Sequence, residues 1–301
     1  MKNMKHKAVL EMATNASPLR YPGGKAVLST FLAGLIRENG LADGVYVEPY
    51  AGGAGAALSL LFGEHVREIV LNDIDRCVFS FWRAVLNHTE TFTGLVRRTR
   101  ITMPEWKRQR TIYRSPARQP QVALAFAGFY LNRCNRSGII ANGGPIGGVR
   151  QTGKWKLNAR FNKPELTRRI ERIALYKSRI DVRNMDALTF LKALCAECDP
   201  ERTLIYLDPP YYDKGSQLYL KYYTPDDHRA LAGFLKANQA VKWVLSYDDV
   251  PEVRELYRDV RHIRYGLNYS ASSVRRGREI LFFSESITIP AHIKLGSDTF
   301  T

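Results

Sequence analysis

The sequence predicts an α/β fold with a mostly parallel sheet and a basic helical segment inserted into it. Strand-like and helix-like patterns alternate over residues 45–87, and the same alternation resumes over residues 179–249. Between these blocks the alternation is replaced by basic helices and a glycine-rich stretch. We therefore expect one domain built from residues 1–86 and 179–301, and a second domain, residues 87–178, inserted into it.

Hydrophobic periodicity and residue composition predict the strands and helices of the sheet domain. Strands are expected at VYVEPY (45–50), REIVLNDID (67–75), TLIYL (203–207) and VKWVLSYDD (241–249), with a further strand and helix in residues 179–197. Helices are expected at residues 56–66, from Arg76 onward, and at residues 228–238. The chain ends in two strand-like runs, 262–273 and 279–286, which predict an antiparallel hairpin at the edge of the sheet.

Charge is concentrated in one part of the chain. The net charge is +16, and the segment from Arg97 to Arg183 holds 21 Lys and Arg against 4 Asp and Glu, so the remainder is close to neutral. A segment this basic would repel itself without an anionic partner, although a solvated charged face is the simpler alternative. We expect a polyanion to bind there.

Other classes of protein are disfavoured by composition. No apolar run approaches the roughly 18 residues of a membrane helix, which favours a cytoplasmic protein without membrane contact. The four cysteines are scattered, and Cys195 and Cys198 lack a second pair or a nearby histidine. We expect reduced thiols and no metal.

A glycine loop after the first strand predicts a nucleoside site. Gly52, Gly53 and Gly55 allow close approach of the backbone to a ligand, and Asp73 follows about 20 residues later at the end of the next strand, where a carboxylate can accept from ribose hydroxyls. The Walker lysine and the strict G-x-G-x-x-G pattern are missing. S-adenosylmethionine is therefore favoured over a phosphate-bearing nucleotide, and Asp75 is expected to be a helix N-cap.

A second glycine motif, YPGGK, spans Tyr21 to Lys25. Gly23 and Gly24 would let the backbone meet the methionine end of the cofactor, with Lys25 facing its carboxylate. The alternative is a plain turn before a helix.

The strongest motif is Asp208-Pro209-Pro210-Tyr211, at the end of an apolar strand. Two prolines fix the backbone where open α/β sheets place their ligands. The amino group of a purine is a poor nucleophile, so a site for its methylation must hold both N–H bonds. The Asp208 carboxylate and the Pro209 carbonyl are suited to accept them, and Tyr211 to stack on the base. A base in a duplex would first have to be flipped out, with the basic segment holding the phosphates.

The order of these motifs, with NDID (72–75) and the basic segment between the last two, resembles the DNA adenine methylase (Dam-like) family over residues 18–283. The resemblance implies a Rossmann-like methyltransferase sheet, with Tyr21, Lys25, Asp73 and Asp208 at the cofactor. Around these motifs we also place Glu48, Pro49, Tyr50, Ile74 and Asp186 at the cofactor site, although Asp186 suits a helix N-cap equally well.

The segments LNRCNRSGI (131–139) and ARFNKP (159–164) resemble the family's recognition region, a helical part with a DNA-contacting β-hairpin. The expected contacts to double-stranded DNA are made by Arg133, Asn135, Arg136, Arg150, Lys154, Lys156 and Arg160. GGPIGG (143–148) departs from the family's pattern, so no base-reading residue is mapped and the target sequence stays open.

The sequence leaves three alternatives open. N4 of cytosine offers the same amino-group chemistry as N6 of adenine. An RNA or protein-amide methyltransferase is less suited to so large a basic segment. A DNA-binding protein without turnover would have no use for an intact Asp208 and Tyr211. The oligomeric state and any partner nuclease stay open.

Overall fold

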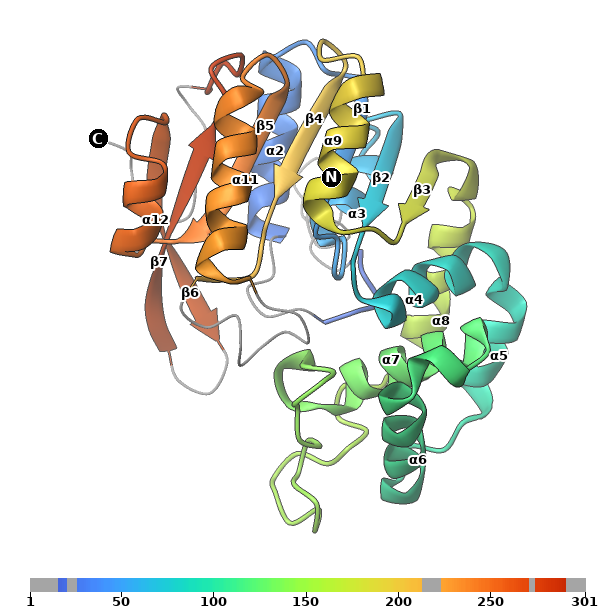
Figure 1. Ribbon diagram of the computed structural model, residues 1–301. Helices are drawn as coiled ribbons and strands as arrows, with labels where there is room; N and C mark the ends of the chain where they lie inside the picture. Colours follow the sequence, from blue (N-terminus) through green and yellow to red (C-terminus); the bar gives the residue numbers. More distant parts are fainter. Residues whose placement is uncertain (1–15, 21–25, 213–222, 271–273, 291–301) are drawn as a thin grey trace, which may run out of the picture.

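A computed structural model of the chain describes residues 16–20, 26–212, 223–270 and 274–290 (Figure 1). Its centre is a seven-stranded sheet with the order β3-β2-β1-β4-β5-β7-β6. The strands are β1 (Val45–Glu48), β2 (Glu68–Asn72), β3 (Ile180–Arg183), β4 (Thr203–Leu207), β5 (Lys242–Asp248), β6 (His262–Ser270) and β7 (Val274–Phe283). Strands β1 to β5 pair in parallel, and β7 runs antiparallel to both β5 and β6. The predicted sheet with an antiparallel edge hairpin is confirmed.

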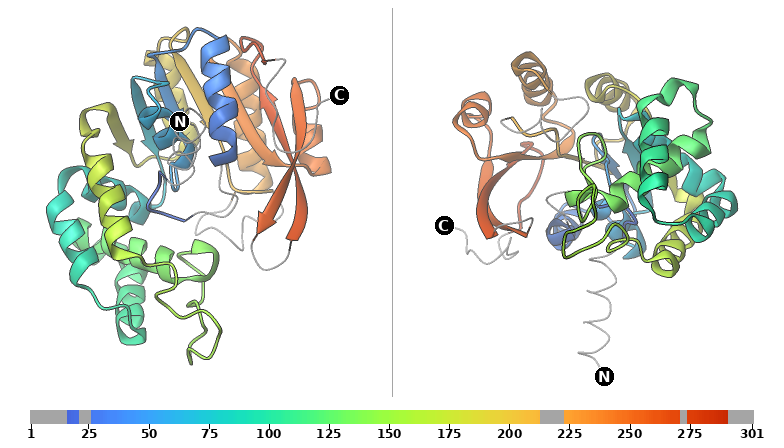
Figure 2. Two further views of the ribbon diagram at one scale, coloured as in Figure 1. Left: turned by 180° about the vertical axis from the view of Figure 1, so that it is seen from behind. Right: turned by 90° about the horizontal axis from the view of Figure 1, so that it is seen from below.

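Helices cover both faces of the sheet (Figures 1 and 2). On one face lie α2 (Ala26–Glu38) and α3 (Gly55–Phe62); on the other lie α9 (Ala187–Glu197), α11 (Pro225–Ala237) and α12 (Pro251–Leu256). Strand β4 shows why its sequence is a continuous apolar run. Leu204 and Tyr206 pack into the cluster with α2 and α3, whereas Ile205 and Leu207 pack into the cluster with α9 and α11.

Between β2 and β3 the chain forms a helical segment. It comprises α4 (Arg76–Asn87), α5 (Thr89–Arg98), α6 (Met103–Arg114), α7 (Gln121–Cys134) and α8 (Lys163–Ala174), with short 3-10 turns at Pro116–Arg118, Arg136–Gly138 and Lys177–Arg179. The rings of Phe81 on α4 and Phe129 on α7 stack at 5.7 Å. These helices share one hydrophobic cluster with α2, α3 and the sheet, so their core is continuous with it. The domain boundaries at residues 87 and 178 stay a prediction.

The β-hairpin expected in the recognition region is not formed. Residues 87–178 are all described and contain no strand, only an isolated bridge between Asn135 and Pro145. The glycine-rich stretch turns instead of extending, because Gly147 and Gly148 have φ of 85° and 76°. The Gln151 amide closes this loop by donating to the carbonyls of residues 146 and 148. A ladder of strand pairs needs extended backbone on both sides of the turn, but residues 139–162 form turns, bends and irregular backbone, which is why the prediction was wrong.

In the part of the chain that the structure describes, none of the helices is both long enough and apolar enough to cross a membrane.

Candidate nucleoside and base site

Three predicted motifs meet at one edge of the sheet. Strand β1 lies between β2 and β4, so the loop after β1, Asp73 after β2 and Asp208 after β4 follow the carboxyl ends of three adjacent strands. Two strand spacings separate Asp73 from Asp208, roughly 10 Å. The helical segment and the β6–β7 hairpin extend beyond this edge at opposite ends of the sheet (Figures 1 and 2). Open α/β sheets bind ligands at this edge, at a point where the strand order reverses.

The glycine loop is held in a strained but defined conformation. Gly52 and Ala54 both have left-handed backbone, with φ of 46° and 47°. The amide of Ala51 donates to the carbonyl of Asn72 at 2.9 Å, and the indole of Trp82 donates to the carbonyl of Gly52 at 3.1 Å. The turn after β1 is therefore anchored to β2 and α4, and it leads directly into α3.

Asp73 lies beside this loop and fits the role of a ribose acceptor. Its Oδ2 accepts from the amide of Gly52 at 2.9 Å, and its Oδ1 accepts from the amide of Asp75 at 2.8 Å. Each carboxylate oxygen has capacity for a further donor, which suits the two hydroxyls of a ribose. Burial, with the charge of Asp75, raises the pKa of Asp73 to about 7. The side chain of Ile74 next to it is 39% exposed, an apolar surface beside the acceptor.

Glu48, at the end of β1, is a buried carboxylate. Its Oε1 accepts from the hydroxyl of Tyr46 and from the amide of Ala57, both at 3.1 Å. Burial raises its pKa to about 8, and the charge of Asp208 contributes to the rise. Asp208 follows β4, the strand that pairs directly with β1, so the Asp208 motif lies beside the glycine loop.

The Asp208–Tyr211 motif follows β4, and Tyr211 and the next residue, Tyr212, are hydrogen-bonded to carboxylates of the neighbouring strands. The hydroxyl of Tyr211 donates to Oε1 of Glu279 at 3.0 Å, and the amide of Tyr212 donates to Oδ1 of Asp248 at 3.2 Å. Sequence reasoning did not single out Glu279. The available signal was a lone carboxylate at the head of the apolar run ILFF, where a charge needs a reason to be buried.

Two further aspartates cap helices. Asp75 accepts from the amide of Cys77 at the start of α4, which confirms it as an N-cap. Asp186 accepts from the amide of Thr189 at the start of α9 and is exposed. Pro49 is buried and Tyr50 half-buried; the hydroxyl of Tyr50 lies 2.6 Å from that of Tyr223. Cofactor contacts by Glu48, Pro49, Tyr50, Ile74 and Asp186 stay predictions, and Tyr21, Gly23, Gly24 and Lys25 lie outside the described residues.

Most of the predicted DNA-contacting residues are exposed on the helical segment. They are Arg136, Arg150, Lys154, Lys156 and Arg160. Two apolar side chains in the loop between α7 and α8 are also exposed, Val149 at 66% and Trp155 at 64%. The ammonium of Lys154 lies 5.8 Å from the centre of the Trp155 ring. A surface of cations with an exposed aromatic ring suits phosphates and bases.

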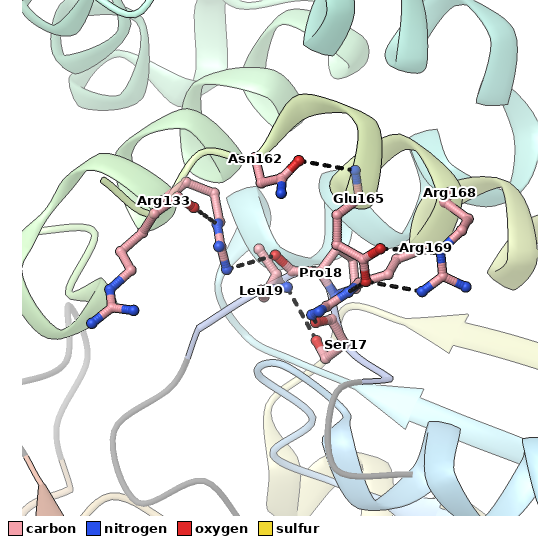
Figure 3. A network of polar contacts seen from close by, with 9 residues as sticks. Ser17, Pro18, Leu19, Arg133, Asn162, Glu165, Arg168 and Arg169 are labelled. Carbon is pink, nitrogen blue, oxygen red and sulfur yellow. Dashed lines mark hydrogen bonds and ion pairs between the residues drawn. The ribbon is translucent and has the colours of Figure 1, made fainter. Parts of the chain in front are cut away.

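Arg133 and Asn135 make internal contacts instead. The Nε of Arg133 donates to the carbonyl of Arg160 at 2.7 Å, and its Nη1 to that of Pro18 at 3.4 Å (Figure 3). Burial, with neighbouring Arg20, lowers the pKa of Arg133. Asn135 is 1% exposed and accepts from the indole of Trp106 at 2.8 Å. The structure therefore gives these two residues a role in joining segments of the protein.

No three His, Cys, Asp or Glu side chains gather as a metal site would require, among the residues that the structure describes.

Comparison with known proteins gives a family. The model of the family described as D12 class N6 adenine-specific DNA methyltransferase matches residues 21–271. No curated protein matches the chain. Similar solved structures include a candidate RNA methyltransferase from Pyrococcus horikoshii, with 9% identity, TM-score 0.40 and coverage of 88% of this chain and 84% of that one. Another is the rRNA methyltransferase aviRa from Streptomyces viridochromogenes, with 13% identity, TM-score 0.36 and coverage of 85% and 84%.

Proposed function

The chain belongs to the D12 class N6 adenine-specific DNA methyltransferase family, and from this premise we propose that it methylates an adenine flipped out of duplex DNA, at the end of β4. Members of this family are S-adenosylmethionine-dependent enzymes that act on DNA.

The cofactor site is proposed at the ends of β1 and β2. Asp73 accepts from the ribose hydroxyls, the left-handed turn at Gly52 lets the ligand approach the backbone, and Ile74 covers the adenine ring. Tyr21 and Lys25 are proposed at the methionine end. When bound, S-adenosylmethionine supplies an electrophilic methyl group.

The base site is proposed at Asp208–Tyr211. The carboxylate of Asp208 and the carbonyl of Pro209 accept the two N–H bonds of the adenine amino group, and this turns the nitrogen lone pair toward the methyl. Tyr211 stacks on the base. The observation that carries this assignment is the parallel pairing of β1 with β4, since it supports a base site, after β4, next to the cofactor loop that follows β1. Positioning and electrostatics supply the catalysis.

The duplex is proposed to bind the exposed cations of the helical segment. Asp208 is half-buried, so part of its side chain is accessible from the edge of the sheet. A base that is still stacked in a duplex cannot reach it, and the target base must therefore be flipped out. Extrusion costs a few kcal/mol, and phosphate contacts by Arg136, Arg150, Lys154, Lys156 and Arg160 offset it.

The test is transfer of a labelled methyl to duplex DNA by wild type and by Asp208→Ala. We expect the variant to lose roughly 10²-fold or more in rate while it still binds DNA. Asp259→Ala, which removes an exposed carboxylate paired with Arg258, is the matched control and should keep its activity. Digestion to nucleosides and mass spectrometry should find N6-methyladenine. Methylcytosine in the digest, or full activity of Asp208→Ala, would contradict the assignment.

A further inference from the structure

A buried carboxylate lies under the catalytic motif. Glu279, on β7, is 1% exposed. Its Oε1 accepts from the hydroxyl of Tyr211 at 3.0 Å, and its Oε2 accepts from the hydroxyl of Tyr265. The hydroxyl of Ser246 lies 3.5 Å from the same Oε2. Burying a carboxylate costs free energy unless hydrogen-bond donors surround it. The burial of Glu279 among tyrosine and serine hydroxyls therefore indicates that it serves to hold these hydroxyls in place.

The strand register explains how this contact is built. Tyr265 on β6 pairs with Glu279 on β7, and Glu279 pairs with Asp248 on β5. Directly opposite residues of an antiparallel pair share a face of the sheet, so the two carboxylates lie side by side. Glu279 holds the hydroxyl of Tyr211, and Asp248 holds the amide of Tyr212. Adjacent strands therefore hold both the tip of the Tyr211 ring and the backbone just after it.

We propose that Glu279 is a positioning residue that sets the plane of the Tyr211 ring for stacking on the target adenine. The proposal rests on the base site assigned above. Stacking needs the ring face in one orientation when the base arrives, and a ring tethered at its hydroxyl has already lost the rotational freedom that stacking would otherwise cost. The edge hairpin thereby contributes to catalysis without touching the base.

The test compares single-turnover methyl transfer in wild type, Glu279→Leu, Tyr211→Phe and the double variant. Leu has no atom that can hydrogen-bond to the tyrosine hydroxyl, and Phe keeps the ring but removes the tether. Each single variant should lower the rate tenfold or more, with affinity for S-adenosylmethionine within twofold of wild type. The double variant should fall no further than Tyr211→Phe, because both changes break the same contact. Tyr265→Phe leaves the Tyr211 contact intact, and we expect less than a threefold fall.

Three results would overturn the inference. Glu279→Leu at the wild-type rate excludes the tether, and so does Tyr211→Phe at the wild-type rate, even if Glu279→Leu fails to fold. Multiplying losses in the double variant would mean that Glu279 acts independently of Tyr211. A wild-type enzyme that transfers no methyl to adenine refutes the proposed function itself, whereas an active wild type with unaffected variants refutes only the role of Glu279.

Discussion

Asn132 joins the helical segment to the chain that precedes the YPGGK motif, and its replacement should weaken both stability and cofactor binding. Its side chain on α7 is fully buried. The Oδ1 accepts from the amide of Arg20 at 2.7 Å, and the Nδ2 donates to the carbonyls of Arg20 at 2.7 Å and Gly138 at 2.8 Å. Arg169 donates to the carbonyl of Ser17 at 3.0 Å, so residues 17–20 are held at several points (Figure 3).

The magnitude follows from these contacts. Asn132→Leu keeps a similar volume but removes three hydrogen bonds, each contributing about 1 kcal/mol, so the free energy of unfolding should fall by about 3 kcal/mol. Residues 17–20 lead directly into Tyr21 and Lys25, the proposed contacts to the methionine end of the cofactor. If half of that energy holds the motif in place, the Kd for S-adenosylmethionine should rise about tenfold.

Urea unfolding and calorimetric titration of S-adenosylmethionine measure the two effects separately. Asn39→Leu is the matched control, because Asn39 also makes three hydrogen bonds, to Leu35 and Thr288, at the end of α2. It should lower stability without changing the Kd. An unchanged Kd in Asn132→Leu, or an equal rise in both variants, would refute the idea that the helical segment positions the motif.

Three further predictions follow from single features. Glu48 has a pKa of about 8 against 4.5 ordinarily, so its protonation stabilises the fold fully below pH 4.5, and this stabilisation, on the order of 5 kcal/mol, is lost as the pH rises through 8. Glu48→Gln should therefore show a smaller drop in urea midpoint between pH 6 and pH 9 than wild type; an equal drop would count against it. Gly138→Ala should lower stability by about 2 kcal/mol or more in thermal unfolding, because φ is +78° and the new Cβ would lie 2.3 Å from the carbonyl oxygen of Arg20. Wild-type stability in this variant would mean that the turn at Gly138 can relax. Replacing Arg150, Lys154 and Lys156 by Ala should reduce the slope of log affinity for duplex DNA against log salt by about 2 to 3; an unchanged slope would show that these cations do not meet phosphates.

The sheet and the order of its motifs were predictable because they depend on local pattern. The run TLIYL is apolar throughout since both faces of β4 are covered, and the Asp75 cap precedes its helix by one residue. A parallel sheet then brings the ends of β1, β2 and β4 to one edge whatever the details of packing. The glycine loop, Asp73 and Asp208 could therefore be assigned to one site without coordinates.

The tertiary structure decided the features that depend on contacts between distant residues. Asn132 is hydrogen-bonded to Arg20, 112 positions away in the sequence, and Tyr211 to Glu279, 68 positions away. The periodicity of a sequence predicts local structure and does not predict contacts at such separations. Arg133 and an exposed arginine such as Arg150 look alike in the sequence, but only the packing of α7 against residues 17–20 turns the former inward. Functional residues that follow the ends of strands can be predicted from the sequence, because they stand next to local patterns. The residues that hold them in position cannot, because their contacts depend on how distant parts of the chain pack together.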